Sequence, residues 1–486
     1  MLSKARHIIS SPADLIAVYL FTVYHYVRLN SGWPARKFYL TVIFLLAAVW
    51  EVIRLIRSHQ LPHLRLDAMS CITLLLGVSI VLPAVFSKYG YLAYDPKHLE
   101  EGAVIWCVYL AIFLLFRKEY VPKKAHLLML LISGYIECLL VIIHSCVYNI
   151  YGANASCYGN PNLLGLGMSI VYALNLLMLA DEQDRTMCLI HYILAFFFSI
   201  GMILSRSDNT LLCIAALLGI LPFLRRITAD LLKKLLRLVS VLLLSMAVVH
   251  LLVLLPSFQG NKTGCVLLAL SWRFSPLLTT AAGLLIFVFQ MLISEGNHLL
   301  RLTQILRVCV IVLMILVMIC LLLANFAGVS FGVADKIFRI NDAWGTGRGR
   351  IWRVCLFAFR EFATPLQKLF GTGINSTPYF TYDFIPKIVN TMKAYYCTPH
   401  NFLLQWLMEG GVIGLVLFCG FCFMALRNGL KRNECCQMLA AGVVTVILAG
   451  WLVTVHSPDI TPYFIVFLAI CAAPEKSGEI EKTTCN

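Results

Sequence analysis

Long apolar stretches alternate with short polar ones along this chain of 486 residues. An apolar stretch of about 16–25 residues can cross the hydrocarbon core of a membrane as a helix. The first, the fourth and the last of the predicted spans are short, so we expect about 12 to 14 transmembrane helices in an all-α, polytopic membrane protein. The predicted spans cover residues 11–27, 38–56, 68–86, 102–116, 125–149, 163–180, 187–204, 208–224, 236–255, 276–293, 305–327, 401–426, 437–455 and 459–473.

One long polar interval, residues 328–400, separates the last three spans from the others. Its first part, 328–350, is rich in glycine and polar residues and predicts a loop. Residues 351–370 place apolar side chains at helical spacing with basic residues between them, which predicts an amphipathic helix at the membrane surface that ends near Pro365. Residues 371–400 are rich in turn-forming and aromatic residues. The aromatic side chains suit stacking on a ligand or anchoring among lipid head groups, and they are Tyr379, Phe380, Tyr382, Phe384, Tyr395 and Tyr396.

The chain therefore divides into five parts by composition. We expect N-terminal spans, a second group of spans that carries two polar motifs, the long loop, C-terminal spans and a polar cytoplasmic tail. These parts cover residues 1–150, 151–327, 328–400, 401–473 and 474–486, respectively.

Lysine and arginine gather in alternate short connections, while connections such as 150–162 and 456–461 are nearly uncharged. The positive-inside rule places basic connections, and here both termini, in the cytoplasm. Eleven predicted spans precede residue 328, and an odd number places the long loop on the opposite side, outside the cytoplasm. The basic connections hold Arg54, Arg57 and Arg65; Arg117, Lys118, Lys123 and Lys124; Arg225, Arg226, Lys233, Lys234 and Arg237; and Arg427, Lys431 and Arg432.

The composition excludes a soluble domain. Hydrophobic residues make up 60% of the chain and charged residues 13%, and the mean hydropathy is +0.84. Part of the net charge of +15 belongs to connections that meet anionic membrane lipid. The long loop is also basic, which hints at an anionic ligand. A basic soluble domain of the kind that binds nucleic acid is absent from the sequence.

Four sets of polar residues converge on the predicted outer face. The first set is Asn160 and Asn162 around Pro161, at the outer start of the span 163–180. The alternative for these residues is an ordinary helix start, since asparagine caps helices and proline opens them.

The second set surrounds Arg206, which stands in a very short connection between two spans. Burying an arginine in the membrane is unfavourable by about 2.5–3.5 kcal/mol on insertion scales, so Arg206 is expected to meet an anion at the membrane border. The alternatives are a salt bridge to Asp208 or extension of the side chain to lipid head groups.

The third set is Arg348 and Arg350, each beside a glycine, followed by Trp352. Glycines beside arginines let backbone N–H groups and guanidinium groups face one anion together. The alternative is a solvated basic loop that touches lipid phosphates.

The fourth set is His400 and Asn401, with Glu409 nearby, where the loop enters a span. An imidazole with an ordinary pKa of ~6.5 can deprotonate or orient a hydroxyl group. The alternative is a helix cap with an uninvolved histidine.

Together these sets indicate one chemistry. A pair of guanidinium groups suits a diphosphate, because each planar group meets two oxygens at once. A diphosphate site and a base for a hydroxyl group, together on an outer membrane face, indicate transfer of a group from a lipid-diphosphate carrier.

At these residues the chain resembles the superfamily of O-antigen ligases and O-antigen polymerases. The resemblance covers about residues 155–425 and rests on four segments, NPNLLGLG, ILSRSD, GRGRIW with the following PLQKLFGTGIN, and TPHNFLLQWLMEGGVIGL. It implies a multi-helix, GT-C-like, inverting glycosyltransferase of the bacterial cytoplasmic membrane. Its donor would be a glycan on undecaprenyl diphosphate, and its acceptor a glycan or a lipid-linked molecule.

The resemblance also implies roles for individual residues. Arg206 and Arg348 would hold the diphosphate, with Arg350 as a rival of Arg348, and His400 would act at the acceptor hydroxyl. Asn160, Asn162, Trp352, Asn401 and Glu409 would support the site. Serine follows Arg206 where members of the superfamily often have glycine.

Metal independence is expected from the residues, and no cofactor is predicted. Glycosyltransferases that use a metal ion need clustered carboxylates on an outer loop, whereas the outer acids of this chain are scattered. Cationic side chains would then stabilise the leaving group.

Three functions follow in order of preference. A polysaccharide polymerase is slightly favoured over a ligase, since the motifs define the donor side and not the acceptor. A flippase or transporter for the same lipid-linked glycan is the alternative. It would need charged residues deep in several spans and two similar halves, and the sequence shows few of the former and none of the latter.

Overall fold

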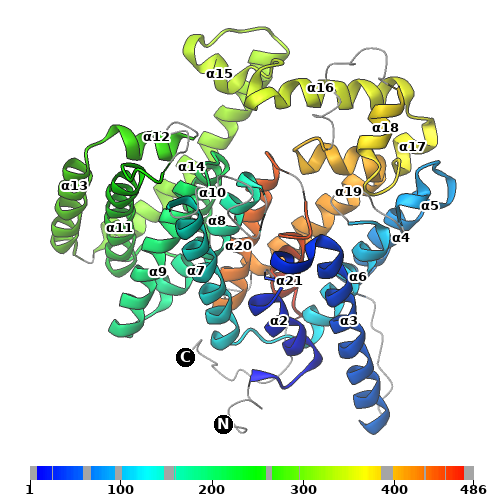
Figure 1. Ribbon diagram of the computed structural model, residues 1–486, viewed down its shortest axis with the longest axis horizontal. Helices are drawn as coiled ribbons and strands as arrows, with labels where there is room; N and C mark the ends of the chain where they lie inside the picture. The colour runs from blue at the N-terminus through cyan, green and yellow to red at the C-terminus, as the bar shows by residue number, and fades with distance from the viewer. Residues whose placement is uncertain are drawn as a thin grey trace.

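Helices account for the regular structure in every part of the chain that the computed structural model describes (Figure 1). The described residues are 8–24, 26–58, 67–93, 101–146, 158, 160–258, 265–294, 296–384, 398–431, 434–454 and 456–474. They include no strand, which confirms the predicted all-α fold.

Each predicted span coincides with a helix. The helices of the first half are α2 Pro12–Thr22, α3 Val27–Ser58, α4 Ala68–Val81, α5 Pro83–Phe86, α6 Ala103–Glu119, α7 Lys124–Cys146, α8 Pro161–Asp181, α9 Arg185–Leu204, α10 Asn209–Leu224 and α11 Ala229–Val253. Those of the second half are α12 Val266–Arg273, α13 Pro276–Phe289, α14 Asn297–Asn325, α15 Asp335–Phe338, α16 Trp344–Phe362, α17 Pro365–Phe370, α18 Thr377–Phe384, α19 Phe402–Lys431, α20 Cys435–Trp451 and α21 Thr461–Cys471.

Seven of the described helical spans are long and apolar enough to cross a membrane, or up to eight if the bent pair α12–α13 is one span. Four shorter apolar helices, α2, α10, α20 and α21, accompany them. The chain is therefore a polytopic membrane protein. The expected number of about 12 to 14 spans is approached only when the shorter helices are included.

The core lies around α8, α20 and α21. α20 packs against α8, α10 and α21, and α21 packs against α6. In Figure 1 the C-terminal helices accordingly lie between the N-terminal helices and the middle of the chain. One hydrophobic cluster runs from α2 to α21, so the first and last spans share a single core.

α14 stands at the periphery. Its apolar window contains no buried residue, so lipid surrounds it on nearly all sides. It packs against α10, where Arg307 Nε donates to the carbonyl of Pro222 at 2.7 Å. At its other end Asn325 binds the next segment, since its Nδ2 donates to the Phe338 carbonyl at 2.7 Å and its Oδ1 accepts from Ile340 N–H at 2.8 Å.

The long loop is more helical than the sequence predicts. Helices α15 to α18 lie together on one side of the molecule, at the top of Figure 1, and we call this side the loop side. The expected loop 328–350 contains α15 and the start of α16, although Gly345, Thr346 and Gly347 have left-handed φ angles of 57°, 60° and 96°. The helix expected over 351–370 is divided near Pro365, because α16 ends at Phe362 and Thr364 caps a new helix, α17, with a capping box.

The aromatic run after residue 376 is also helical. It forms α18, where Phe380 is fully buried against Tyr89, with ring centroids 6.2 Å apart, whereas Tyr382 is 59% exposed. The expectation of a common stacking surface is therefore wrong for Phe380, which belongs to a small core beneath α16. Tyr395 and Tyr396 lie outside the described residues.

We predict that the loop side lies outside the cytoplasm. Ser330 is exposed next to α15, so a Ser330→Cys variant should react with an impermeant thiol reagent in intact cells. The background lacks Cys157, Cys265 and Cys397. A Gln183→Cys variant in the α8–α9 connection is the control and should react only after lysis. The reverse labelling pattern would invert the topology.

Candidate functional site

The turn between α9 and α10 presents Arg206. Ser205 and Ser207 on either side are buried, and Ser207 Oγ donates to Asn162 Oδ1 at the start of α8, at 2.7 Å. A Cβ added at Gly165 would lie 3.0 Å from the Ser207 Cβ, so the glycine lets the turn approach α8 closely. Asn162 is thus joined to the segment that carries Arg206, as a supporting residue should be.

Asn160 has the role of an ordinary helix cap, which was the alternative to a functional role in the sequence analysis. Its side chain accepts hydrogen bonds from the N–H groups of Asn162 and Leu163 and caps α8. Pro161 follows at the first helical position, where its missing N–H is not needed.

Backbone strain occurs at two of the predicted site residues. Arg206 and His400 have φ angles of 57° and 49°, in the left-handed region. Such a conformation costs a non-glycine residue of order 1–3 kcal/mol and is held only where the surroundings enforce it. Strain of this kind clusters at functional sites, and here it sets the direction of both side chains.

Arg206 lies over the ring of Phe258, with its guanidinium carbon 5.6 Å from the ring centroid. Asp208, its expected alternative partner, accepts a hydrogen bond from Val266 N–H at the start of α12, at 2.7 Å. The aspartate therefore ties the turn to α12.

Arg348 is half-buried at the point where α16 becomes regular. Burial lowers the pKa of its guanidinium group, and the charge of Asp208 partly offsets this effect. Arginine nevertheless remains charged in proteins. Among the residues that the structure describes, Arg348 forms no ion pair or hydrogen bond through its side chain. A half-buried cation in this state is well suited to receive an anion.

The glycine after Arg348 cannot be replaced without rearrangement. A Cβ added at Gly349 would lie 1.9 Å from the carbonyl oxygen of Asn341. This close contact fixes the start of α16 against the segment before it.

Arg350, the rival of Arg348, is placed differently. Its Nε lies 3.6 Å from Asp342 Oδ2, and Asp342 is also paired with Arg353. The side chain of Arg350 is 46% exposed. An anion would have to compete with a carboxylate for Arg350, which favours Arg348 as the phosphate ligand.

His400 is held between α16 and α19. Trp352 Nε1 donates to the carbonyl of Pro399 at 2.8 Å, which tethers the preceding residue to α16. Asn401 caps α19 by accepting from Leu404 N–H at 3.0 Å, and its Nδ2 donates to the Leu452 carbonyl at 2.9 Å. Trp352 and Asn401 therefore position the histidine from both sides.

The environment of His400 keeps its imidazole neutral. Burial, and secondly the positive charge of Arg348, lower the pKa of His400 to about 4. At neutral pH the ring can therefore accept a proton. Trp352, four residues after Arg348 in α16, binds the residue before His400, so α16 brings Arg348 to the same region as His400 although 52 residues separate them in the sequence.

Glu409 does not lie beside His400 but near the far end of the first segment of α19. Its carboxylate is fully buried and accepts from Asn375 N–H at 2.9 Å and from Thr377 Oγ1 at 2.8 Å. It thus fixes the segment between α17 and α18. Glu409 therefore stabilises the framework around the first segment of α19.

Sequence analysis missed a buried pair at the base of the site. Glu101 Oε2 and His456 Nδ1 are 2.6 Å apart, and Tyr109 donates to the other carboxylate oxygen at 3.0 Å. Burial lowers the pKa of His456, but the hydrogen bond and charge of Glu101 outweigh it and raise that pKa above its ordinary value. The pair fixes the α20–α21 connection, which also provides the Leu452 carbonyl to Asn401. The pairing could not be read from the sequence, because 355 residues separate the partners. The polar run His456-Ser457-Pro458-Asp459 between two apolar spans was the visible signal.

The described residues contain no candidate metal site. Within the described part of the chain, no group of three or more His, Cys, Asp and Glu side chains could hold a metal ion.

Part of the chain matches the model of a known protein family. Residues 263–419 match the family model described as O-antigen ligase. This match confirms the resemblance to the superfamily of O-antigen ligases and polymerases. It includes Arg348, Arg350, Trp352, His400, Asn401 and Glu409, whereas Asn160, Asn162 and Arg206 precede it. No curated protein matches the chain.

The matched region therefore contains both half-buried groups, Arg348 and His400, and the charge of the first lowers the pKa of the second. The match indicates similarity to O-antigen ligases over these residues.

We predict that the acid limb of the pH–rate profile lies well below the ordinary histidine pKa of ~6.5. A base must be neutral to accept a proton, so with His400 in that role activity should fall only as the pH approaches about 4, the pKa of this residue. Arg348→Gln removes a positive neighbour and so raises the pKa of His400. The residual activity of this variant should therefore begin to fall at a higher pH than that of the wild type. Arg360→Gln, at an exposed site, should leave the limb in place. A wild-type limb near pH 6.5 would contradict the neutral-base interpretation.

Proposed function

We propose that the protein is an inverting glycosyltransferase that moves a glycan from undecaprenyl diphosphate to an acceptor hydroxyl. The observation that carries this proposal is that α16, which holds the side chain of Arg348, unpaired among the described residues, is joined through Trp352 to the residue before His400, whose imidazole is neutral. A cation for the leaving group and a base for the nucleophile are the two groups that such a transfer requires.

The reaction follows from these positions. The acceptor hydroxyl gives its proton to His400 while its oxygen bonds to the anomeric carbon of the donor sugar. The bond from that carbon to the phosphate oxygen breaks, and the electron pair leaves with the diphosphate. Arg206 and Arg348 stabilise the charge that develops there. A single displacement inverts the configuration at the anomeric carbon.

A polymerase and a ligase share this donor site and differ in the acceptor, and we slightly favour the polymerase. A flippase for the same lipid would use cations on the loop side as well. It would not need a base held beside a cation, so the environment of His400 favours transfer over transport.

We predict that His400→Ala abolishes transfer without loss of folded protein. Removal of a general base typically lowers the rate by about 10²–10⁴-fold. Purified variants are compared by the glycan that they form from a lipid-linked donor and acceptor. His298→Ala, at an exposed histidine in the first turn of α14, is the matched control. Wild-type transfer by His400→Ala at equal protein concentration would refute the proposal.

We predict that Arg206→Lys and Arg348→Lys each weaken donor binding by about tenfold or more. A charge-assisted guanidinium contact contributes about 1.5–3 kcal/mol, and lysine keeps the charge but lacks the planar pair of donors. Binding of the lipid-diphosphate donor to each variant is the measurement. Arg350→Lys should have a smaller effect, because Arg350 is paired with Asp342. A loss confined to Arg350→Lys would transfer the phosphate-binding role to that residue.

We predict that transfer continues in excess EDTA. Arg206 and Arg348 supply the positive charge that a metal ion provides in metal-dependent enzymes. Turnover of donor and acceptor by purified protein is measured before and after chelation. A strict requirement for added Mg²⁺ or Mn²⁺ would contradict the prediction and direct attention to Asp335, Asp342 and Asp383.

A further inference from the structure

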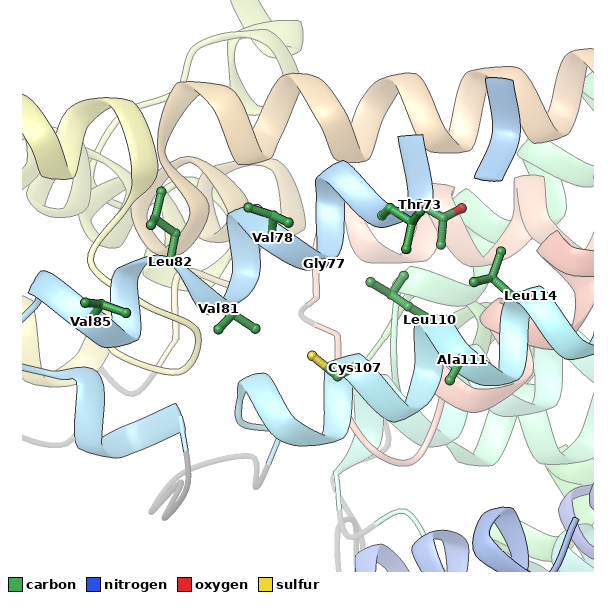
Figure 2. Close-up of a pocket in the computed structure, with 11 residues that line it drawn as sticks. Thr73, Gly77, Val78, Val81, Leu82, Val85, Cys107, Leu110, Ala111 and Leu114 are labelled. Carbon is green, nitrogen blue, oxygen red and sulfur yellow. The ribbon is translucent and has the colours of Figure 1, made fainter. Parts of the chain in front are cut away.

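The two faces of α6 differ in chemistry. Figure 2 shows Cys107, Ala111 and Leu114 on the wall of an open groove toward α4, whose lining is almost entirely apolar. Trp106 and Tyr109 instead belong to the hydrophobic core and are fully buried. The groove is ordinary lipid-facing surface, whereas the polar groups at the start of α6 are directed into the protein, where each needs a partner.

Glu101, two residues before α6, brings a carboxylate into this core. It is fully buried, and its Oε2 lies 2.6 Å from Nδ1 of His456, which is also buried. The Tyr109 hydroxyl donates to the other carboxylate oxygen at 3.0 Å. Loss of one partner from such a pair leaves a buried group without compensation, which is strongly unfavourable. The pair therefore ties the start of α6 firmly to the connection between α20 and α21.

The connection reaches the candidate site through Leu452. The Leu452 carbonyl, four residues before His456, accepts from Asn401 Nδ2 at 2.9 Å. Asn401 Oδ1 accepts from Leu404 N–H at 3.0 Å, so both polar atoms of this amide are engaged. Asn401 directly follows His400. A movement of the connection is therefore transmitted to the residue next to the imidazole.

A second route runs through aromatic rings. The ring of Trp106 meets the imidazole of His456 edge-on, with centroids 5.3 Å apart, and meets the ring of Trp406 at 5.1 Å. Trp406 lies in the first segment of α19 and stacks at 4.4 Å on Phe418, which follows the non-helical Gly411. His456 thus supports the first segment of α19 at two points, its cap and its buried face.

The position of His400 is sensitive to this support. Its left-handed φ of 49° is retained only while the surroundings enforce it. A base must also reach the hydroxyl proton within about 2.6–3.2 Å, and a misplacement of about 1 Å can lower a rate by about 10²-fold. A small movement of Asn401 is therefore enough to change the rate of turnover.

We propose that Glu101 and His456 are positioning residues for the transfer, and that they hold the imidazole of His400 in its working orientation through Asn401. This inference rests on the proposed function, in which His400 takes the proton of the acceptor hydroxyl. The pair governs the rate of turnover and leaves donor binding unchanged.

A second buried histidine provides a matched control. His191 Nδ1 lies 2.7 Å from Asn175 Oδ1, and Asn175 Nδ2 donates to the His191 carbonyl at 2.9 Å. Both residues are fully buried and join α9 to α8. His191 lies in the first half of α9, whereas Arg206 follows the end of that helix. Breaking this pair removes buried hydrogen bonds without touching the route to Asn401.

Chemical modification reports the position of His400 without requiring catalysis. Diethyl pyrocarbonate acylates neutral imidazoles, and mass spectrometry of the full-length protein in detergent gives the rate at each histidine. Glu101→Ala should raise the rate at His400 severalfold, because the imidazole loses its enforced position. Glu101→Gln keeps the size and an acceptor oxygen for His456, so it should restore most of the wild-type rate. His298, exposed in the first turn of α14, is the internal reference and should react equally in every variant.

The control variant His191→Gln should leave the rate at His400 unchanged. All variants are compared as folded, monodisperse protein, and if Glu101→Ala does not fold, His456→Ala removes the pair from the other side and takes its place. Equal rates at His400 in the wild type and in the variants of the pair would refute the proposal. An increase for His191→Gln as large as that for Glu101→Ala would show general loosening and would also refute it.

Kinetics of the purified variants test the role in transfer. Glu101→Ala should lower kcat by about tenfold or more with little change in KM for the donor, because displacement of a base slows the reaction without weakening donor binding. The double variant Glu101→Ala/Asn401→Ala should lose clearly less than the product of the two single losses, since both substitutions break the same link. A loss equal to the full product would place the effect of the pair elsewhere and overturn the proposal.

The outcomes separate this inference from the proposed function. An unchanged rate of modification at His400, in a protein whose transfer depends on His400, leaves the transferase function intact and overturns the positioning role. An altered rate of modification in a protein that transfers no glycan overturns the proposed function, and the positioning role in transfer with it.

Discussion

The break in α19 at Gly411 is the constraint on which the loop side depends. A helix that breaks within a membrane exposes carbonyl groups, and lipid offers them no hydrogen bonds. Here the carbonyls of Met408 and Glu409 accept from the N–H groups of Thr372 and Gly373, at 2.9 and 3.0 Å. Gly411 has a φ of 66°, and a Cβ there would lie 2.4 Å from the Leu369 carbonyl, so the two segments fit only without a side chain.

This joint fixes several elements at once. The segment after α17 is held to the first part of α19, and through Ser87 it is also held to α5. The same first part of α19 begins at Phe402, directly after His400 and the capping residue Asn401. The positions of α5, α18 and the segment that holds His400 are therefore connected through the residues around this break.

Sequence patterns predicted the parts of this molecule that depend on local order. Hydropathy located the membrane-spanning helices, because each span must be apolar along its own length. The division near Pro365 was visible for the same reason, since proline and a capping threonine act locally. The proximity of Arg348 to His400 could be anticipated only from the resemblance. The buried Glu101–His456 pair could not be found, because nothing local links residues that meet through packing.

The sequence also could not distinguish Arg348 from Arg350. Both stand beside glycine, and both are basic residues in one short run. The difference comes from Asp342, which lies within 4 Å of one guanidinium group and not of the other. The left-handed conformations of Arg206 and His400 were equally invisible, since they arise from the surroundings and not from the residue types.

The length of α14 has a mechanical consequence. Its 28-residue apolar span is about 42 Å long at the rise of an α-helix, against about 30 Å for the hydrocarbon core of a bilayer. A helix with this mismatch tilts or extends beyond the core, and α14 has few protein neighbours to oppose a tilt. Asn325 joins its end to the segment that leads to α16. A change in bilayer thickness should therefore shift the segment that leads to Arg348 along the membrane normal, relative to the rest of the site.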